Sequence, residues 1–263
     1  MNKVISILTT LCLAITFVAA GLAACIAPPV TSALSNVFSR DDVSPFSRAE
    51  LVKVAEATRD YSFGSHDLAR LYQTIYEVDS EYAARLTAVG AKLPEDFPKL
   101  PDTTLAPNAT KLASVFKDAS VKYVYDEKTV SHLDDCHQMF ISALPGLVIA
   151  AALALIGIIA GGVRMGKRKL GKVFMAAGII VLLAFIALGV WAIVDFDGFF
   201  TAFHQAFFAK QGNWAFPYDS LLICALPEAF WMGMGAIWLV VAVLLSVIFI
   251  LVGNALRKAK KGR

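Results

Sequence analysis

Two short segments of the sequence carry the residue types that perform acid–base chemistry. In the first, His132 and Asp135 are three residues apart, so that on a helix their side chains would share a face. An aspartate beside an imidazole can fix the orientation of the ring and stabilise its protonated form. Because a short His/Asp spacing is common, the segment also fits a solvated helix beside a membrane.

The second segment surrounds His204 with aromatic residues. If residues 196–208 form a helix, Phe200, Phe203, His204 and Phe207 lie on one face. Such an element would lie in a membrane interface or dip into the mouth of a helix bundle. Burial there disfavours the charged imidazole and leaves a neutral ring that can act as a base. The alternative is a histidine that only packs, since a lone histidine is weak evidence of function.

The elements that must position these residues are membrane spans. Hydrophobic residues make up 57% of the 263 residues and charged residues only 17%, whereas soluble domains are roughly half apolar and about a quarter charged. The apolar residues gather in four uncharged runs, at 4–26, 141–163, 173–194 and 230–252. Each run reaches the length of about 20 residues that a helix needs to cross a bilayer.

The basic residues predict the orientation of these spans. Lys3 precedes the first run, and basic clusters at 164–172 and 257–263 follow the second and the fourth. Lys and Arg accumulate on the cytoplasmic side of short loops, so we expect both termini in the cytoplasm. The clusters suit anionic lipid of the inner leaflet, and despite the net charge of +3 nothing in the sequence supports nucleic-acid binding.

The sequence therefore predicts an all-α membrane protein with four transmembrane helices and a mainly helical extracytoplasmic domain. The predicted transmembrane helices occupy 1–26, 141–163, 173–194 and 230–252, with a cytoplasmic basic loop at 164–172 and a cytoplasmic tail at 253–263. The extracytoplasmic parts are the helical domain at 27–140 and an interfacial segment at 195–229.

Local signals support helices in the outer domain. Ser47 and Glu50 form a capping-box pattern before an apolar run, and Ser65 can cap a second helix. A third helical pattern contains Leu112 and Phe116. Four prolines between 94 and 107 predict an irregular stretch before it.

The first span and the cysteines raise two questions. Leu22-Ala23-Ala24-Cys25 resembles a lipoprotein cleavage box, but the run at 4–26 exceeds the apolar region of about 7–15 residues in cleaved signal peptides. We therefore expect an uncleaved anchor. Cys136 and Cys224 both fall in segments predicted to lie outside, where a disulfide can form, and the sequence leaves that pairing open.

Further residues complete a pattern that resembles a known family. His204 is followed by an Asn-Trp pair, Asn213 and Trp214, then by Asp219 and a Pro-Glu-x-Phe stretch that begins at Pro227. With the four spans, His-x-x-Asp before the second span and the aromatic His204 motif after the third, this arrangement resembles the lipoprotein intramolecular transacylase (Lit) family. The sequence departs from the family pattern at Thr129, where a glutamate is expected, and at Cys136, where a valine is expected.

The resemblance implies an acyl transfer within a bacterial lipoprotein. Family members are thought to move an acyl chain from the diacylglyceryl group to the amine of the lipoprotein's N-terminal cysteine. His204 would be the base, His132 would support the oxyanion or protonate the leaving oxygen, and Asp135 would orient His132. The residues implied to bind the substrate are Phe200, Phe203, Phe207, Asn213, Trp214 and Asp219.

The same reasoning predicts the setting of the reaction. It requires neither a cofactor nor a metal, and the expected partners are diacylated lipoproteins and membrane lipid. The expected place is the bacterial cytoplasmic membrane, with the catalytic side extracytoplasmic. The sequence gives no oligomeric state.

Two other functions remain open from the sequence. A metal-dependent membrane hydrolase could use His132, Asp135 and His204 as zinc ligands. A non-catalytic membrane protein could use its outer domain to bind a partner. If the protein is a transacylase, His132 and His204 must meet at the outer membrane interface, since both have to flank one ester carbonyl.

Overall fold

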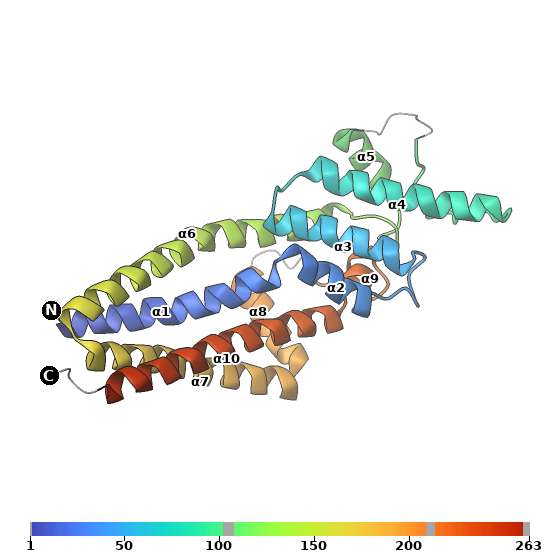
Figure 1. Cartoon of the computed structure of the whole chain (residues 1–263). Coiled ribbons are helices and arrows are strands. Elements are labelled where there is room, and N and C mark those ends of the chain that lie inside the picture. Colours follow the sequence, from blue (N-terminus) through green and yellow to red (C-terminus); the bar gives the residue numbers. More distant parts are fainter. Residues whose placement is uncertain (1, 102–107, 209–213, 260–263) are drawn as a thin grey trace. The chain divides into compact units, whose positions relative to one another are not determined.

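The computed structural model describes residues 2–101, 108–208 and 214–259, and these form helices without any strand (Figure 1). They divide into two compact units. We call residues 1–25, 141–205 and 235–263 the membrane bundle, and residues 26–140 and 206–234 the helical domain.

Four long helices form most of the membrane bundle. They are α1 (Asn2–Cys25), α6 (Glu127–Arg164), α7 (Lys167–Val194) and α10 (Glu228–Lys258). Two of them, α6 and α10, begin in the helical domain. Each of the four helices is long and apolar enough to cross a bilayer. In hydrocarbon every backbone polar group needs an internal partner, which a helix provides. The prediction of an all-α protein with four transmembrane helices is confirmed.

Three of the helices extend beyond the apolar runs that revealed them. Helix α6 begins at Glu127, fourteen residues before the apolar run at 141–163. Helix α7 starts inside the basic loop, directly after Gly166, whose φ of 76° lets the chain reverse. Hydropathy detects only the part of a helix that lies in lipid, so the polar turns at the ends were not visible in the sequence.

Close backbone contacts hold the bundle together. A Cβ added at Gly171 of α7 would collide with the carbonyl oxygen of Gly253 on α10, and one at Gly253 would lie 2.6 Å from the carbonyl oxygen of Gly171. Next to this crossing, Phe249 packs between Phe17 and Phe174, with ring centroids 4.7 and 4.9 Å away. Small residues let transmembrane helices approach until their backbones touch.

The helical domain is built from shorter helices around its own apolar core. These are α2 (Pro28–Phe38), α3 (Arg48–Phe63), α4 (Leu68–Ala88), α5 (Ala109–Phe116) and α9 (Leu221–Ala225). The largest fully buried side chains of the core include Phe46, Leu51, Leu71, Ile75, Leu112, Phe116 and Tyr125. The helices with strong apolar periodicity were predicted, whereas α2 and the short α9 were not.

Of the two predicted helix caps, the one at α3 is confirmed and the one at α4 is wrong. At α3 the predicted capping box forms, with the Ser47 backbone N–H donating to Glu50 at 2.7 Å. At α4 the N-cap is Asp67 and not Ser65, because Asp67 accepts from the backbone of Ala69 and Arg70 at 2.9 and 3.2 Å. The cysteine pairing left open by the sequence does not form, since all four cysteines are free thiols.

Replacing Gly171 by alanine should destabilise the bundle, because its methyl group meets backbone that cannot rotate away. Overpacking of this kind costs about 1–3 kcal/mol. The matched control is Gly189→Ala on the same helix, where an added Cβ meets nothing within 4 Å. Thermal unfolding of the detergent-solubilised protein should show a lower midpoint for Gly171→Ala only. Equal midpoints for the two variants would contradict the close crossing of α7 and α10.

Candidate active site

His132 lies in the second turn of α6, within the helical domain. The start of α6 is fixed by Asp126, whose side chain accepts from the Thr129 backbone N–H at 2.8 Å and from the Thr129 hydroxyl at 2.6 Å. Thr129 therefore helps to close the helix cap at the position where the family pattern has a glutamate. This cap sets where the helix begins, and so which face of α6 carries His132.

His132 is buried, with only 9% of the residue exposed. Phe208 and Phe216 pack against its imidazole, with ring centroids 5.3 and 5.6 Å away. Nε2 lies 3.8 Å from the sulfur of Cys136, one turn further along α6. Phe216 belongs to the Asn-Trp-Ala-Phe-Pro stretch, yet its spacing gave no sign that it would pack on His132.

Lys128 holds the segment with Phe216 in place. Its ammonium donates to the carbonyl oxygen of Ala215 at 2.6 Å and lies 5.2 Å from the centre of the Phe216 ring. A cation over an aromatic face is attracted by the negative face of the ring. Phe216, which packs on His132, is thereby held by the same helix that carries the histidine.

Asp134, the neighbour of the predicted Asp135, makes the strong carboxylate contacts of this region. Its Oδ1 accepts from the Tyr61 hydroxyl at 2.5 Å and lies 3.5 Å from Nε2 of His66. Burial, and then the contact with Asp134, raise the pKa of Tyr61, so its hydroxyl stays protonated and donates. Asp134 ties α6 to α3, while the orienting role predicted for Asp135 stays a prediction.

A pair of stacked histidines adds to this connection. The imidazoles of His66 and His137 lie 3.8 Å apart and are tilted by 11°. Their Nδ1 atoms lie 3.0 Å from the carbonyl oxygen of Tyr61 and 3.2 Å from that of Ser62, at the end of α3. Sequence reasoning missed the pair, because 71 positions separate its members and no periodic pattern links them. Among the described residues, no three His, Cys, Asp or Glu side chains are arranged to hold a metal.

His204 lies on α8 (Phe196–Phe208), so the predicted helix is present. Asp195 ends α7 and begins α8, since its side chain accepts from the Gly198 backbone N–H at 2.9 Å. The His204 ring packs on Phe200 and Phe203, with centroids 3.9 and 5.4 Å away. The shared aromatic face that the spacing predicted is therefore formed at these positions.

The surroundings of His204 favour a neutral imidazole with a defined tautomer. Burial lowers the pKa of His204 from its ordinary 6.5, and the hydrogen bond to Phe200 offsets part of that effect. Nδ1 lies 2.8 Å from the carbonyl oxygen of Phe200, a group that can only accept, so Nδ1 carries the proton. Nε2 then holds the lone pair that a general base needs.

The remaining predicted substrate-binding residues have mixed surroundings. Phe203 and Phe207 are exposed, at 38% and 59%. Trp214 is half-buried, and Asp219 pairs with Lys122 at 3.0 Å. Asn213 lies outside the described residues. The two exposed phenylalanines present part of their rings at the surface, whereas the Asp219 carboxylate pairs with a lysine of the protein.

The imidazole of His204 should titrate below pH 6.5, because burial disfavours its charged form. NMR of protein labelled with ¹³C at histidine Cε1 can follow all four rings in a detergent micelle, with His204→Gln identifying the signal. The His204 signal should keep its neutral position as the pH falls through 6.5 and move only at lower pH. A His204 signal that is half-titrated above pH 6.5 would contradict a buried neutral ring.

Comparison with known proteins identifies a family and two similar solved structures. The profile of the family "Lipoprotein intramolecular transacylase Lit" matches residues 84–231, which is more than half of the chain. Among solved structures, the membrane integral lipoprotein intramolecular transacylase Lit from Bacillus cereus is similar, with a TM-score of 0.67 and 16% identity over 98% of this chain and 96% of that one.

A histidine-to-arginine variant of the same Bacillus cereus protein matches with a TM-score of 0.62 and 16% identity, over 98% of this chain and 92% of that one. The curated proteins contain no match. At this identity the solved structures establish the fold, whereas the family profile covers both the His132 segment and the His204 segment. The chain is therefore a member of the lipoprotein intramolecular transacylase (Lit) family.

Proposed function

We propose that this membrane protein transfers an acyl chain from the diacylglyceryl group of a bacterial lipoprotein to the amine of that lipoprotein's N-terminal cysteine. The observation that carries the proposal is the environment of His204. Its ring is buried, its Nδ1 hydrogen bond fixes the tautomer, and it lies in a segment that the family profile covers. A neutral imidazole of this kind is suited to deprotonate an amine.

In the proposed reaction His204 begins by removing a proton from the cysteine ammonium. The free amine attacks the ester carbonyl of the acyl chain, and a tetrahedral oxyanion forms. When the intermediate collapses, the bond from carbon to the glycerol oxygen breaks, the attacking nitrogen loses a proton and the glycerol oxygen takes one up. The products are an amide and a free glycerol hydroxyl. The reaction consumes no water and requires no covalent enzyme intermediate.

Both reacting groups belong to one molecule, so the protein does not have to bring two substrates together. Intramolecular reaction already supplies the proximity that an enzyme must otherwise provide by binding two substrates. What remains is proton transfer and stabilisation of the oxyanion. We assign the second task to His132, whose buried imidazole can donate to the oxyanion or to the leaving oxygen.

The course of the chain supports a joint action of the two histidines. His204 and Phe208 are four residues apart on α8, so they are neighbours on one face of that helix. The Phe208 ring in turn packs on His132, with a centroid distance of 5.3 Å. One aromatic side chain is thus adjacent along the helix to the proposed base and in contact with the proposed oxyanion partner.

Aromatic residues of α8 supply the proposed contacts with the acyl chains. Phe200, Phe203 and Phe207 recur at helical spacing, and the last two are exposed. We assign Trp214 and Asn213 to the glyceryl and peptide end of the substrate. Asp219, which pairs with Lys122, acts by holding its own segment rather than by contact with the substrate.

Substitution of either proposed catalytic histidine should abolish the transfer. General acid–base catalysis contributes roughly 10²–10⁴-fold in rate, so His132→Asn and His204→Asn should each lower product formation by at least about 100-fold. The measurement is mass spectrometry of lipoprotein N-termini, which separates diacyl cysteine from the N-acylated lyso form.

The matched control is His137→Gln, a histidine on the same helix as His132 that packs on His66 instead. It should retain activity within a few-fold when protein levels in the membrane are equal. Full activity of the His204→Asn variant would refute the assignment of the base. Equal loss in the control and in His132→Asn would show that His132 acts only through the fold.

The charge distribution supports an extracytoplasmic site. Lys3, Arg164 and Arg257 lie at or near those ends of α1, α6 and α10 that carry the basic clusters, whereas Asp195 follows the opposite end of α7. Under the positive-inside rule the basic ends face the cytoplasm. We therefore place α8 and the helical domain outside.

Reporter fusions can test this orientation. A reporter that is active only outside the cytoplasm should be active when inserted beside Pro94, in the helical domain. A reporter that fluoresces only inside should be bright when fused after the basic C-terminal tail. Activity of the two reporters in the reverse pattern would overturn the orientation and leave the four-span fold unchanged.

A further inference from the structure

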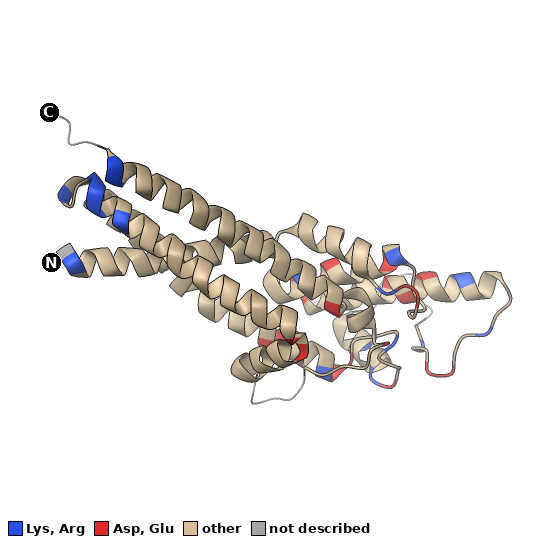
Figure 2. Cartoon of the chain, turned by 90° about the horizontal axis from the view of Figure 1, so that it is seen from below, with Lys and Arg blue, Asp and Glu red and all other residues tan. Residues whose placement is uncertain are grey.

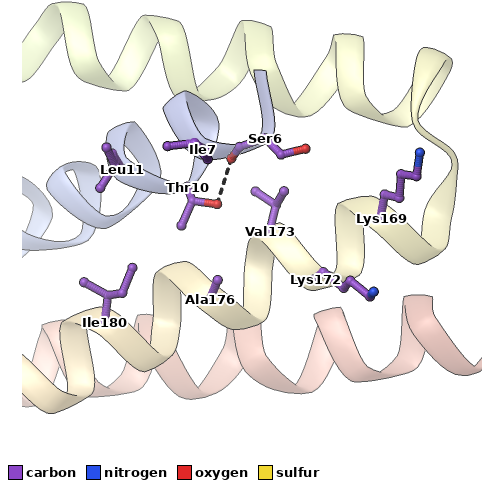
Figure 3. A pocket seen from close by; sticks show the side chains of 9 residues that line it. All are labelled: Ser6, Ile7, Thr10, Leu11, Lys169, Lys172, Val173, Ala176 and Ile180. Carbon is purple, nitrogen blue, oxygen red and sulfur yellow. Dashed lines mark hydrogen bonds between the residues drawn. The ribbon is translucent and has the colours of Figure 1, made fainter. Parts of the chain in front are cut away.

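An open groove runs along α1 and α7 on the surface of the membrane bundle. Its first part has a volume of about 420 Å³ and is lined by Ser6, Ile7, Thr10, Leu11, Lys169, Lys172, Val173, Ala176 and Ile180 (Figure 3). A second part of about 360 Å³ shares Leu11 and Ile180 with it and continues as far as Val18 and Ala184. The groove therefore continues along the two helices.

The walls of the groove suit a hydrocarbon chain. Small residues at helical spacing, Ser6, Thr10 and Ala14 on α1, leave room between the helices. The Thr10 hydroxyl donates to the Ser6 carbonyl oxygen at 2.8 Å, so it does not leave a donor unpaired in the groove. The other lining residues away from the mouth are aliphatic, so an acyl chain can pack against them through van der Waals contacts.

The mouth of the groove is cationic and lacks counter-charge. Lys169 and Lys172 are exposed at one end of α7, and Figure 2 shows Lys and Arg gathered at this end of the bundle. The only acidic residues of the membrane bundle are Asp195 and Asp197. They follow the other end of α7, at least about 35 Å away along a helix that rises 1.5 Å per residue.

We propose that this groove binds one anionic glycerophospholipid, with an acyl chain between α1 and α7 and the phosphate between Lys169 and Lys172. An anionic headgroup supplies the charge that no side chain of the bundle provides, and the acyl chain fills the apolar length behind it. A zwitterionic lipid fits the groove but brings its own cation to the lysines. Basic pockets between transmembrane helices are the usual recognition sites for anionic headgroups.

The proposed site is independent of acyl transfer. It lies at the Lys169 end of α7, whereas His204 follows the opposite end of that helix by ten residues. A bound lipid would bridge α1 and α7 and stabilise their packing. Loss of the lipid should therefore leave the acid–base chemistry of His204 intact.

Native mass spectrometry of the full-length protein in detergent tests the proposal. Dioleoyl phosphatidylglycerol and dioleoyl phosphatidylcholine are titrated separately, and the bound lipids are counted. We expect one phosphatidylglycerol to bind far more tightly than the next, and no such tight phosphatidylcholine. Free glycerol 3-phosphate should not displace the lipid, because it lacks the acyl chain.

Two variants with the same change of charge locate the site. Each basic residue near an anionic headgroup contributes about fivefold in affinity, so Lys169→Gln with Lys172→Gln should weaken the tight binding roughly 30-fold. The control pair, Lys167→Gln with Arg168→Gln, lies outside the lining and should weaken it only a few-fold. Ala176→Phe should also weaken binding, because it fills the groove without changing the charge.

Three results would overturn the proposal. Equal binding of the two lipids would show that the lysines select no headgroup. An equal loss in the two charge pairs would show general attraction to a basic surface. Unchanged phosphatidylglycerol binding in Ala176→Phe would show that no acyl chain occupies the groove.

Discussion

The bilayer cannot hydrogen-bond to an exposed peptide group, and this constraint governs the architecture of the protein. It requires helices across the membrane and keeps charges at their ends. It also removes the usual hydrophobic force between helices, so that the bundle depends on close contact. The crossing of Gly171 with Gly253, where two backbones touch, is the clearest example. Close van der Waals contact between helices therefore contributes more to the stability of this bundle than it does in a soluble protein.

The same constraint shapes the chemistry of the candidate site. An imidazole buried among Phe200 and Phe203 loses the hydration that would stabilise its charge, so it remains neutral. A backbone carbonyl next to it then decides which nitrogen holds the proton. Helix α6 carries the other proposed histidine, and it runs without a break from its cap at Asp126 through His132 and on towards lipid. The position of His132 along α6 and the neutral state of His204 therefore both follow from local contacts.

Hydropathy and spacing predicted much of this from the sequence. The four spans, the Ser47 capping box and the aromatic face around His204 are local patterns, and the structure contains each of them. Other features depend on contacts between distant residues. The stacking of His66 on His137 and the Tyr61 hydrogen bond to Asp134 join positions that no period relates. The cap at Asp67 could not be distinguished from one at Ser65, because two capping residues stand close together in a turn.

The central claim is that His132 and His204 act on one ester carbonyl, and cross-linking tests it most directly. Cysteines introduced at these two positions, in a protein whose four native cysteines are replaced, can be treated in membranes with a short thiol cross-linker. Our account predicts an intramolecular cross-link between positions 132 and 204, detected as a joined peptide pair after proteolysis. Efficient labelling of each single thiol by a maleimide, without any 132–204 cross-link, would contradict a shared site.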